Sequence, residues 1–428
     1  MLAQRKLDSR VPISSWSWYC VIVLLLSCSC SCREVNLFTR PKVRAPQGRL
    51  EVRSLLTDAS SAPGLCDSII KAAGYPCEEV TVQTSDGFLL GLQHIPYGVA
   101  GITNDTQKRP PVFLQHGLTQ GGDDWVLNSP SQSLAYILAD RGFDVWIGNL
   151  RGTRFSHGHT TLSPDDWRFW DWSFNEHASI DMPTMVGYVQ RSTASQVYYV
   201  GHSQGTIMAL AAMSDPDTGM SNLLKASALL APIAYMQHMK SQLLSVSVDL
   251  MLDKIVGIFG TREFNLNNEV GEKLLGLACA EPNVFCDNLF RAYTGPNCCF
   301  NDSRALYYLQ WEPQSTSTKN LQHLAQMIRS GKFERFDYGW LGNIIHYKQG
   351  TPPLYDLSRI PSATNILMVS GGQDGLADPS DVKKLQDEMT CQVESLILPS
   401  YGHADFVVGT QAHVDVYNRV IQYFQSLP

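Results

Sequence analysis

The sequence predicts an α/β fold, in which a mostly parallel sheet is interrupted by one inserted, mainly helical segment. Strand-like apolar runs alternate with amphipathic helix-like runs over most of the 428 residues, as expected of a parallel sheet covered by helices. The alternation stops at about residue 234 and resumes near residue 360. A Gly-His-Ser-Gln-Gly turn at residues 201–205 joins a strand-like run to an alanine-rich, helix-like run.

The N-terminus predicts a targeting signal. Three basic residues, the last of them Arg10, precede an apolar stretch from Trp16 to Leu26, and small residues follow. This stretch has roughly half of the ~20 apolar residues that a membrane-spanning helix needs. We therefore expect residues 1–32 to be a cleaved signal peptide, with an uncleaved signal anchor as the alternative, and residues 33–65 to be a leader or propeptide. The destination is then secreted and extracellular, or vacuolar or lysosomal.

The composition of the chain argues against nucleic acid as a partner. The net charge is −7, and a negative chain without a basic run is a poor ligand for nucleic acid, because phosphate binding needs clustered Lys and Arg. Hydrophobic residues make up 44% and charged residues 17% of the chain, as in an ordinary globular protein without a stable transmembrane segment. The length allows one large domain with an insertion.

Cysteines and sequons support export. Cys66 and Cys77 flank a short segment ahead of the first strands, which favours a disulfide. A second group could form two bridges whose pairing the sequence leaves open, with Cys391 left over. Its members are Cys279, Cys286, Cys298 and Cys299. A zinc site is the alternative, which the missing C-x-x-C partner and the absence of an interleaved histidine disfavour. Asn104 and Asn301 begin glycosylation sequons.

The core elements follow in chain order. The first two strand-like runs are joined by Ser85-Asp86-Gly87, a hairpin signal. The expected strands are Glu79–Thr84, Phe88–Ile95, Val112–Gln115, Phe143–Ile147, Gln196–Val200, Ala226–Ile233, Asn365–Ser370 and Glu394–Leu398. The expected helices are Ser131–Ala139, Thr206–Met213, Asp381–Met389 and Val414–Phe424. The core thus occupies residues 66–233 and 360–428. Residues 234–359 are too long for a loop, which predicts a separately folded cap or lid.

The turn at residues 201–205 has the features of the nucleophile elbow of an α/β-hydrolase. Only small residues fit beside so sharp a turn, and the Ser203 hydroxyl is pushed out above the sheet. A serine hydroxyl needs a base to take its proton, and the base needs an acid to fix its tautomer. In this fold the acid and then the histidine follow the serine along the chain, each on a loop at the carboxyl end of a strand.

Two loops supply these partners. Asp374 follows the strand Asn365–Ser370 and is the expected acid; Asp378 is the reserve, although its position favours capping the next helix. His403 follows the last strand and is the expected base. The oxyanion of the intermediate needs N–H donors. We expect these from Gln204, directly after the nucleophile, and from Leu118, in a turn that His116 and Gly117 shape. We expect neither a metal nor an organic cofactor.

Several motifs together resemble the acid lipase family, which includes gastric, lysosomal and plant triacylglycerol lipases. They are Leu114-Gln115-His116-Gly117-Leu118, Asn149-Leu150-Arg151-Gly152-Thr153, Gly201-His202-Ser203-Gln204-Gly205-Thr206, Gly371-Gly372-Gln373-Asp374-Gly375-Leu376-Ala377-Asp378 and Tyr401-Gly402-His403-Ala404-Asp405-Phe406. Cys298-Cys299-Phe300-Asn301 looks most like the plant members. The resemblance covers about residues 65–428 and implies hydrolysis of acylglycerol or steryl esters beneath a lidded cap. The cap cysteines depart from the animal pattern, so their disulfide is not carried over. The glycine after Asp374 is a second departure.

The cap bears on the substrate. Apolar residues recur at helical spacing between Leu244 and Phe259, as in a helix that lines an acyl tunnel or moves as a lid at an oil–water interface. A helix that packs this stripe on the core is the simpler alternative. We expect a lipid ester at an oil–water or membrane surface, most simply triacylglycerol. The alternatives are a steryl ester hydrolase, a short-chain carboxylesterase, an acyltransferase and an inactive binding protein.

Overall fold

The fold is taken from a computed structural model that describes residues 63–101, 108–241, 262–265, 291 and 293–428. All of them belong to one compact unit, Pro63–Pro428. The predicted signal peptide, nearly all of the leader, and the residues Asn104, Cys279 and Cys286 lie outside the described residues, as does the apolar stripe from 244 to 259. Among the helices of the described part, none combines the length and apolar character that crossing a membrane requires.

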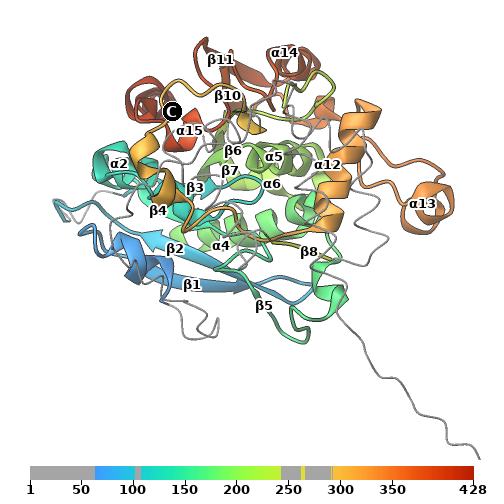
Figure 1. The fold of residues 1–428 in the computed structure, drawn as a ribbon, viewed down its shortest axis with the longest axis horizontal. Helices are drawn as coiled ribbons and strands as arrows, with labels where there is room; N and C mark the ends of the chain where they lie inside the picture. The colour runs from blue at the N-terminus through green and yellow to red at the C-terminus, as the bar shows by residue number, and fades with distance from the viewer. Residues whose placement is uncertain (1–62, 102–107, 242–261, 266–290, 292) are drawn as a thin grey trace, which may run out of the picture. The chain divides into compact units, whose positions relative to one another are not determined.

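The predicted α/β architecture is confirmed. The described residues form a nine-stranded sheet with the order β1-β2-β4-β3-β6-β7-β10-β11, and β5 pairs with β2 (Figure 1). The strands are β1 (Glu78–Gln83), β2 (Phe88–Ile95), β3 (Pro111–Gln115), β4 (Asp144–Gly148), β5 (Gly158–His159), β6 (Val197–His202), β7 (Leu224–Leu230), β10 (Asn365–Gly371) and β11 (Gln392–Leu398). Pairs involving β2 are antiparallel, and the pairs from β4 through β11 are parallel. Each of the eight expected strands is present within two or three residues of its predicted ends.

The parallel register determines where the site lies. Gln115 at the end of β3 pairs with Gly201 near the end of β6, and Gly371 at the end of β10 pairs with Leu398 at the end of β11. The loops that follow these four strands therefore leave the sheet at one edge. In open α/β sheets, ligands bind at this carboxyl edge.

Helices cover the sheet, and α5 is the most deeply placed. All residues of α5 (Gln204–Ser214) are buried, which agrees with its nearly uniform small and apolar sequence. The sheet also contacts α2 (Leu134–Asp140), α4 (Met182–Thr193) and α14 (Pro379–Glu388). The predicted C-terminal helix is α16 (Asn418–Ser426), preceded by the π-helical turn His413–Tyr417.

Helices are the predominant regular structure among the described residues of the inserted region. It contains α11 (Ala305–Tyr308), α12 (Thr318–Ser330) and α13 (Gly339–Tyr347), drawn in orange in Figure 1. It also contains a short antiparallel ladder between β8 (Glu263–Phe264) and β9 (Thr316–Ser317), which the sequence pattern had not indicated. The division of the chain into core and cap at 234–359 stays a prediction.

Disulfides agree with the sequence as far as they are described. Cys66 is bonded to Cys77, as expected. Cys298 is bonded to its neighbour Cys299, a pairing that the sequence left open. Cys391 is free and half-buried.

Candidate active site

Ser203 lies in a strained turn between β6 and α5. Its φ is +54° and its ψ −119°, a conformation that non-glycine residues rarely adopt. The glycines on either side are required by packing. A Cβ on Gly205 would lie 2.7 Å from the Gln115 carbonyl oxygen, and one on Gly201 would lie 2.9 Å from the Gly205 carbonyl oxygen. The predicted elbow geometry is therefore present.

Ser203, His403 and Asp374 form one chain of hydrogen bonds. Ser203 Oγ lies 2.7 Å from His403 Nε2. His403 Nδ1 lies 2.9 Å and 3.0 Å from the two carboxylate oxygens of Asp374. All three side chains are buried. With Nδ1–H donating to Asp374, Nε2 is left as an acceptor that faces the serine hydroxyl, the arrangement that general-base chemistry needs.

Backbone donors fix the acid. Asp374 Oδ1 accepts from the N–H groups of Leu376 and Ala377, each at 2.8 Å. Asp378 has the other role that its position suggested: it caps α14 by accepting from Ser380 N–H at 2.8 Å, and it forms an ion pair with Lys240. The structure therefore brings Asp374, and not Asp378, to His403.

The loop after β3 lies directly against the elbow. A Cβ on Gly117 would lie 2.9 Å from Ser203 Cβ, so the turn that contains Leu118 runs beside the elbow. His116 is buried, and its Nε2 accepts from Leu150 N–H at 3.1 Å, which agrees with the expected shaping role. Gln204 is the first residue of α5, and helix N-terminal N–H groups favour negative charge.

His202 ties the nucleophile turn to the loop that carries His403, a role that its position in the sequence did not reveal. Its Nε2 donates to the His403 carbonyl oxygen at 3.0 Å, and the two rings lie 4.9 Å apart. Its Nδ1 lies 3.2 Å from Gln120 Oε1, which also accepts from Gly117 N–H at 2.8 Å. Burial and the nearby His403 lower the pKa of His202 well below its ordinary value. The neutral ring carries a single N–H, which the His403 carbonyl oxygen accepts, so the hydrogen bond of His202 holds the base loop, whereas its contact with Gln120 Oε1 brings two acceptors together.

The segment just before the disulfide at Cys298 supports the acid and base loops from the inserted region. The Thr294 carbonyl oxygen accepts from the N–H groups of Gly375 and His403 at 3.1 Å and 3.3 Å. Asn297 Oδ1 accepts from Ala404 N–H at 3.2 Å. Asp405 holds the disulfide in place by accepting from the N–H groups of both Cys298 and Cys299. The sequence gives no sign of these contacts, because they join segments that lie far apart along the chain.

Burial favours the neutral form of two other histidines near the site, His116 and His177. Burial lowers the pKa of His116 to about 4. Burial and the charge of Arg151 lower the pKa of His177 well below its ordinary value. His177 Nδ1 lies 3.2 Å from the side-chain amide nitrogen of Gln204, and Asn320 of α12 donates to the oxygen of the same amide at 2.9 Å. The Gln204 side chain is therefore held from both sides.

A buried acidic cluster lies farther along the loop after β3. The carboxylates of Asp123, Asp124 and Glu312 come within 4.8 Å of one another. Gln314 donates to Asp123, and Gly121 N–H donates to Glu312. Burial, with mutual repulsion of the carboxylates, raises the pKa of Asp124 and Glu312 well above the ordinary value. Neutral carboxyl groups are therefore favoured there.

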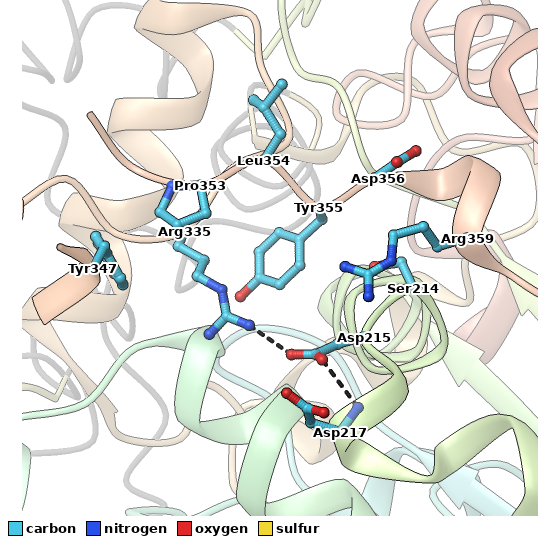
Figure 2. A pocket seen from close by; sticks show the side chains of 10 residues that line it. All are labelled: Ser214, Asp215, Asp217, Arg335, Tyr347, Pro353, Leu354, Tyr355, Asp356 and Arg359. Atoms are coloured by element: carbon cyan, nitrogen blue, oxygen red, sulfur yellow. Dashed lines mark hydrogen bonds and ion pairs between the residues drawn. The ribbon is translucent and has the colours of Figure 1, made fainter. Parts of the chain in front are cut away.

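A separate polar cavity of about 320 Å³ lies at the far end of α5, beyond Ser214 (Figure 2). Arg335 crosses it, forms an ion pair with Asp215 at 2.6 Å and lies over the ring of Tyr355. Ser203 directly precedes α5 and Ser214 ends it, so this cavity lies a helix length from the elbow. It is not part of the site around Ser203.

The sequence matches known families over most of its length. Residues 66–129 match the model described as a partial alpha/beta-hydrolase lipase region, and residues 110–250 match the alpha/beta hydrolase fold. Triacylglycerol lipase 1 of Arabidopsis thaliana is 44% identical over 374 residues, 87% of this chain and 93% of the relative. Human gastric triacylglycerol lipase is 37% identical over 354 residues, 81% of this chain and 87% of the relative.

Solved structures support the fold. A soluble variant of monoglyceride lipase from Saccharomyces cerevisiae matches with a TM-score of 0.52 at 13% identity, covering 82% of this chain and 97% of that one. A structure described as an open-form lipase matches with a TM-score of 0.51 at 14% identity, covering 82% of this chain and 99% of that one. Identities this low bear on the fold alone. The fold, the family models and the long, well-covered relatives agree, and the chain belongs to the acid lipase family of α/β-hydrolases, the family that its motifs resemble.

Proposed function

We propose that the protein is a serine lipase that hydrolyses carboxylic esters of lipids, with triacylglycerol as the substrate. Ser203 is the nucleophile, His403 the general base and Asp374 the acid that orients it. The observation that carries the proposal is the unbroken chain of hydrogen bonds from Ser203 Oγ through His403 to Asp374. The plant and gastric relatives that are named triacylglycerol lipases support the choice of substrate.

Acylation starts with transfer of the Ser203 proton to His403 Nε2 as Oγ attacks the ester carbonyl carbon. Negative charge moves to the carbonyl oxygen, and the N–H groups of Gln204 and Leu118 stabilise it. The carbon–oxygen bond to the alcohol then breaks. His403 gives its proton to the departing oxygen, so the alcohol leaves neutral and the acyl group stays on Ser203.

Deacylation repeats these steps with water. His403 takes a proton from water as its oxygen attacks the acyl carbon, and the same proton returns to Ser203 Oγ when the ester bond to the enzyme breaks. The fatty acid is released and the enzyme is restored. In both steps Asp374 stabilises the imidazolium that forms on His403 and does not itself take up the proton.

The inserted region 234–359 acts as a cap over this site in our proposal. Two hydrogen-bonded contacts between this region and the site support the proposal. The Thr294 carbonyl oxygen accepts from the loops that carry Asp374 and His403, and Asn320 donates to the side chain of Gln204. Insertions over a hydrolase site commonly determine specificity.

We propose entry into the secretory pathway, which the predicted signal peptide and the Cys66–Cys77 disulfide support.

A substrate panel tests the proposal. Purified protein is assayed on emulsified triolein, emulsified cholesteryl oleate and dissolved p-nitrophenyl butyrate, with and without a primary alcohol. We expect the greatest fatty acid release from triolein and no dominant transfer to the alcohol. Activity confined to the dissolved ester would favour a carboxylesterase, and a dominant ester product with the alcohol would favour an acyltransferase. No turnover of any ester would favour a binding protein.

A further inference from the structure

Helix α13 (Gly339–Tyr347) has its polar and apolar faces reversed relative to an ordinary surface helix. Four of its apolar side chains face solvent: Trp340 is 66% exposed, Leu341 69%, Ile344 37% and Ile345 68%. The helix's buried residue is the polar Asn343. A helix that packs on a protein core buries its apolar stripe and exposes its polar one. This arrangement therefore needs an explanation other than packing against the core.

Polar contacts hold α13 in this orientation. Asn343 donates to the Asp337 carboxylate at 2.6 Å and accepts from Tyr338 N–H at 3.0 Å. Asp337 also accepts from Gly339 N–H at 2.8 Å, and Tyr347 donates to the Phe336 carbonyl oxygen at 3.0 Å. The rings of Tyr338 and His346 stack at 3.8 Å. The apolar face is therefore presented outward by a fixed set of inward hydrogen bonds.

The composition of the helix suits a lipid surface. None of its nine residues is Asp, Glu, Lys or Arg, so no charge has to be desolvated when the outer face enters an apolar phase. Trp340, Tyr338 and Tyr347 are residue types that collect at membrane–water interfaces. Lys348, just after the helix, is exposed and has an alkyl stem long enough to keep its ammonium group in water.

The size of the face argues against a second copy of the chain. The four side chains present on the order of 400–500 Å² of apolar surface, the size of the largest patch on a typical monomer. A stable protein interface needs about 800 Å² from each partner. Insertion of a small apolar face into lipid has no such minimum, because affinity grows with each apolar group that leaves water.

We propose that the outward face of α13, formed by Trp340, Leu341, Ile344 and Ile345, is the surface by which the protein docks on an uncharged or zwitterionic lipid surface. The proposal rests on the proposed function, because docking brings a lipase to an insoluble substrate. The same stretch of chain connects to the site: α12 donates from Asn320 to Gln204, next to Ser203, and α13 follows α12. Figure 1 places α13 at the margin of the view, apart from the sheet.

The test is binding to large unilamellar vesicles of phosphatidylcholine, measured by co-sedimentation. All proteins carry Ser203→Ala, so the result does not depend on whether the chain hydrolyses esters. The variant is Leu341→Ser with Ile345→Ser. The matched control is Ile397→Ser with Val414→Ser, which removes two apolar groups, 63% and 52% exposed, from β11 and from the π-helical turn 413–417. With Ser203 intact, both pairs are also assayed on dissolved p-nitrophenyl butyrate.

We expect the α13 variant to bind vesicles at least about tenfold more weakly than its parent. The control should bind as the parent does, and all proteins with Ser203 should have the same rate on the dissolved ester. Binding should also survive 0.5 M NaCl, because no charge attraction drives it. Equal vesicle binding by variant and parent would overturn the proposal. Loss of a parent dimer in the variant, with vesicle binding unchanged, would assign the face to a second copy and overturn it too. If the double variant unfolds, Ile345→Ser alone is judged by the same results.

Discussion

Replacing the proposed acid by its amide, Asp374→Asn, tests the orientation of the base. The carboxylate oxygen Oδ1 accepts from the N–H groups of Leu376 and Ala377, so the amide oxygen takes this position in the variant. The amide NH₂ then faces His403 Nδ1 from the position of Oδ2, at 2.9 Å. Two donors cannot share this contact, and the other contact of Nδ1, 3.0 Å from the Oδ1 position, competes with the two backbone N–H groups that the amide oxygen already accepts. The imidazole responds by moving its proton to Nε2, where it can no longer accept a proton from Ser203.

A base with the wrong tautomer costs about 10⁴-fold in rate, or about 5.5 kcal/mol in activation free energy. We expect kcat on dissolved p-nitrophenyl butyrate to fall by about this factor with a small change in KM. The matched control is Asp378→Asn, four residues away, which caps α14. Asparagine caps a helix as well as aspartate does, so we expect this control to keep the cap of α14 and to lose less than about threefold in kcat. A kcat of Asp374→Asn within tenfold of the parent, or a larger loss of kcat in Asp378→Asn, would show that Asp374 does not orient His403.

Two further predictions concern buried charges away from the triad. Arg151 is 1% exposed and ion-paired with the fully buried Asp181. Arg151→Met leaves that carboxylate unpaired and should lower the free energy of unfolding by about 3–5 kcal/mol, measured by urea unfolding. Adding Asp181→Asn should recover part of the loss. A loss below about 1 kcal/mol would contradict this. The second prediction concerns Asp124, whose raised pKa means that the native state binds more protons than the unfolded state. Stability should therefore fall as pH rises above the ordinary carboxyl pKa of about 4. In Asp124→Asn the thermal midpoint should fall less steeply with pH than in the parent. An equally steep fall would show that Asp124 does not carry a raised pKa in the folded protein.

The sequence could predict the parts of the site that depend on chain order and turn chemistry. Ser203 was identifiable because a glycine-flanked turn after a buried strand has few other uses. Asp374 and His403 were identifiable because each follows a strand whose carboxyl end must lie at the same edge of a parallel sheet. The capping role of Asp378 could be predicted because this residue directly precedes a helix that was expected to begin near Ser380.

Contacts between distant segments could not be predicted in this way. The contact of Thr294 with the acid and base loops joins residues some eighty to one hundred and ten positions apart, and no periodicity in the sequence encodes it. The hydrogen bond from His202 to the His403 carbonyl oxygen depends on how two loops pack. The reversed faces of α13 were hidden as well, because its apolar residues occur at the spacing of an ordinary amphipathic helix. Whether such a stripe faces inward or outward depends on Asn343 and its partners.

Active-site labelling shows directly whether Ser203 is the nucleophile. The protein is treated with a fluorophosphonate probe, digested, and mapped by mass spectrometry, with Ser203→Ala alongside. We expect one label per chain, on Ser203, together with loss of ester hydrolysis, and neither label nor turnover in the folded variant. A label on another residue, or ester turnover retained by Ser203→Ala, would contradict it.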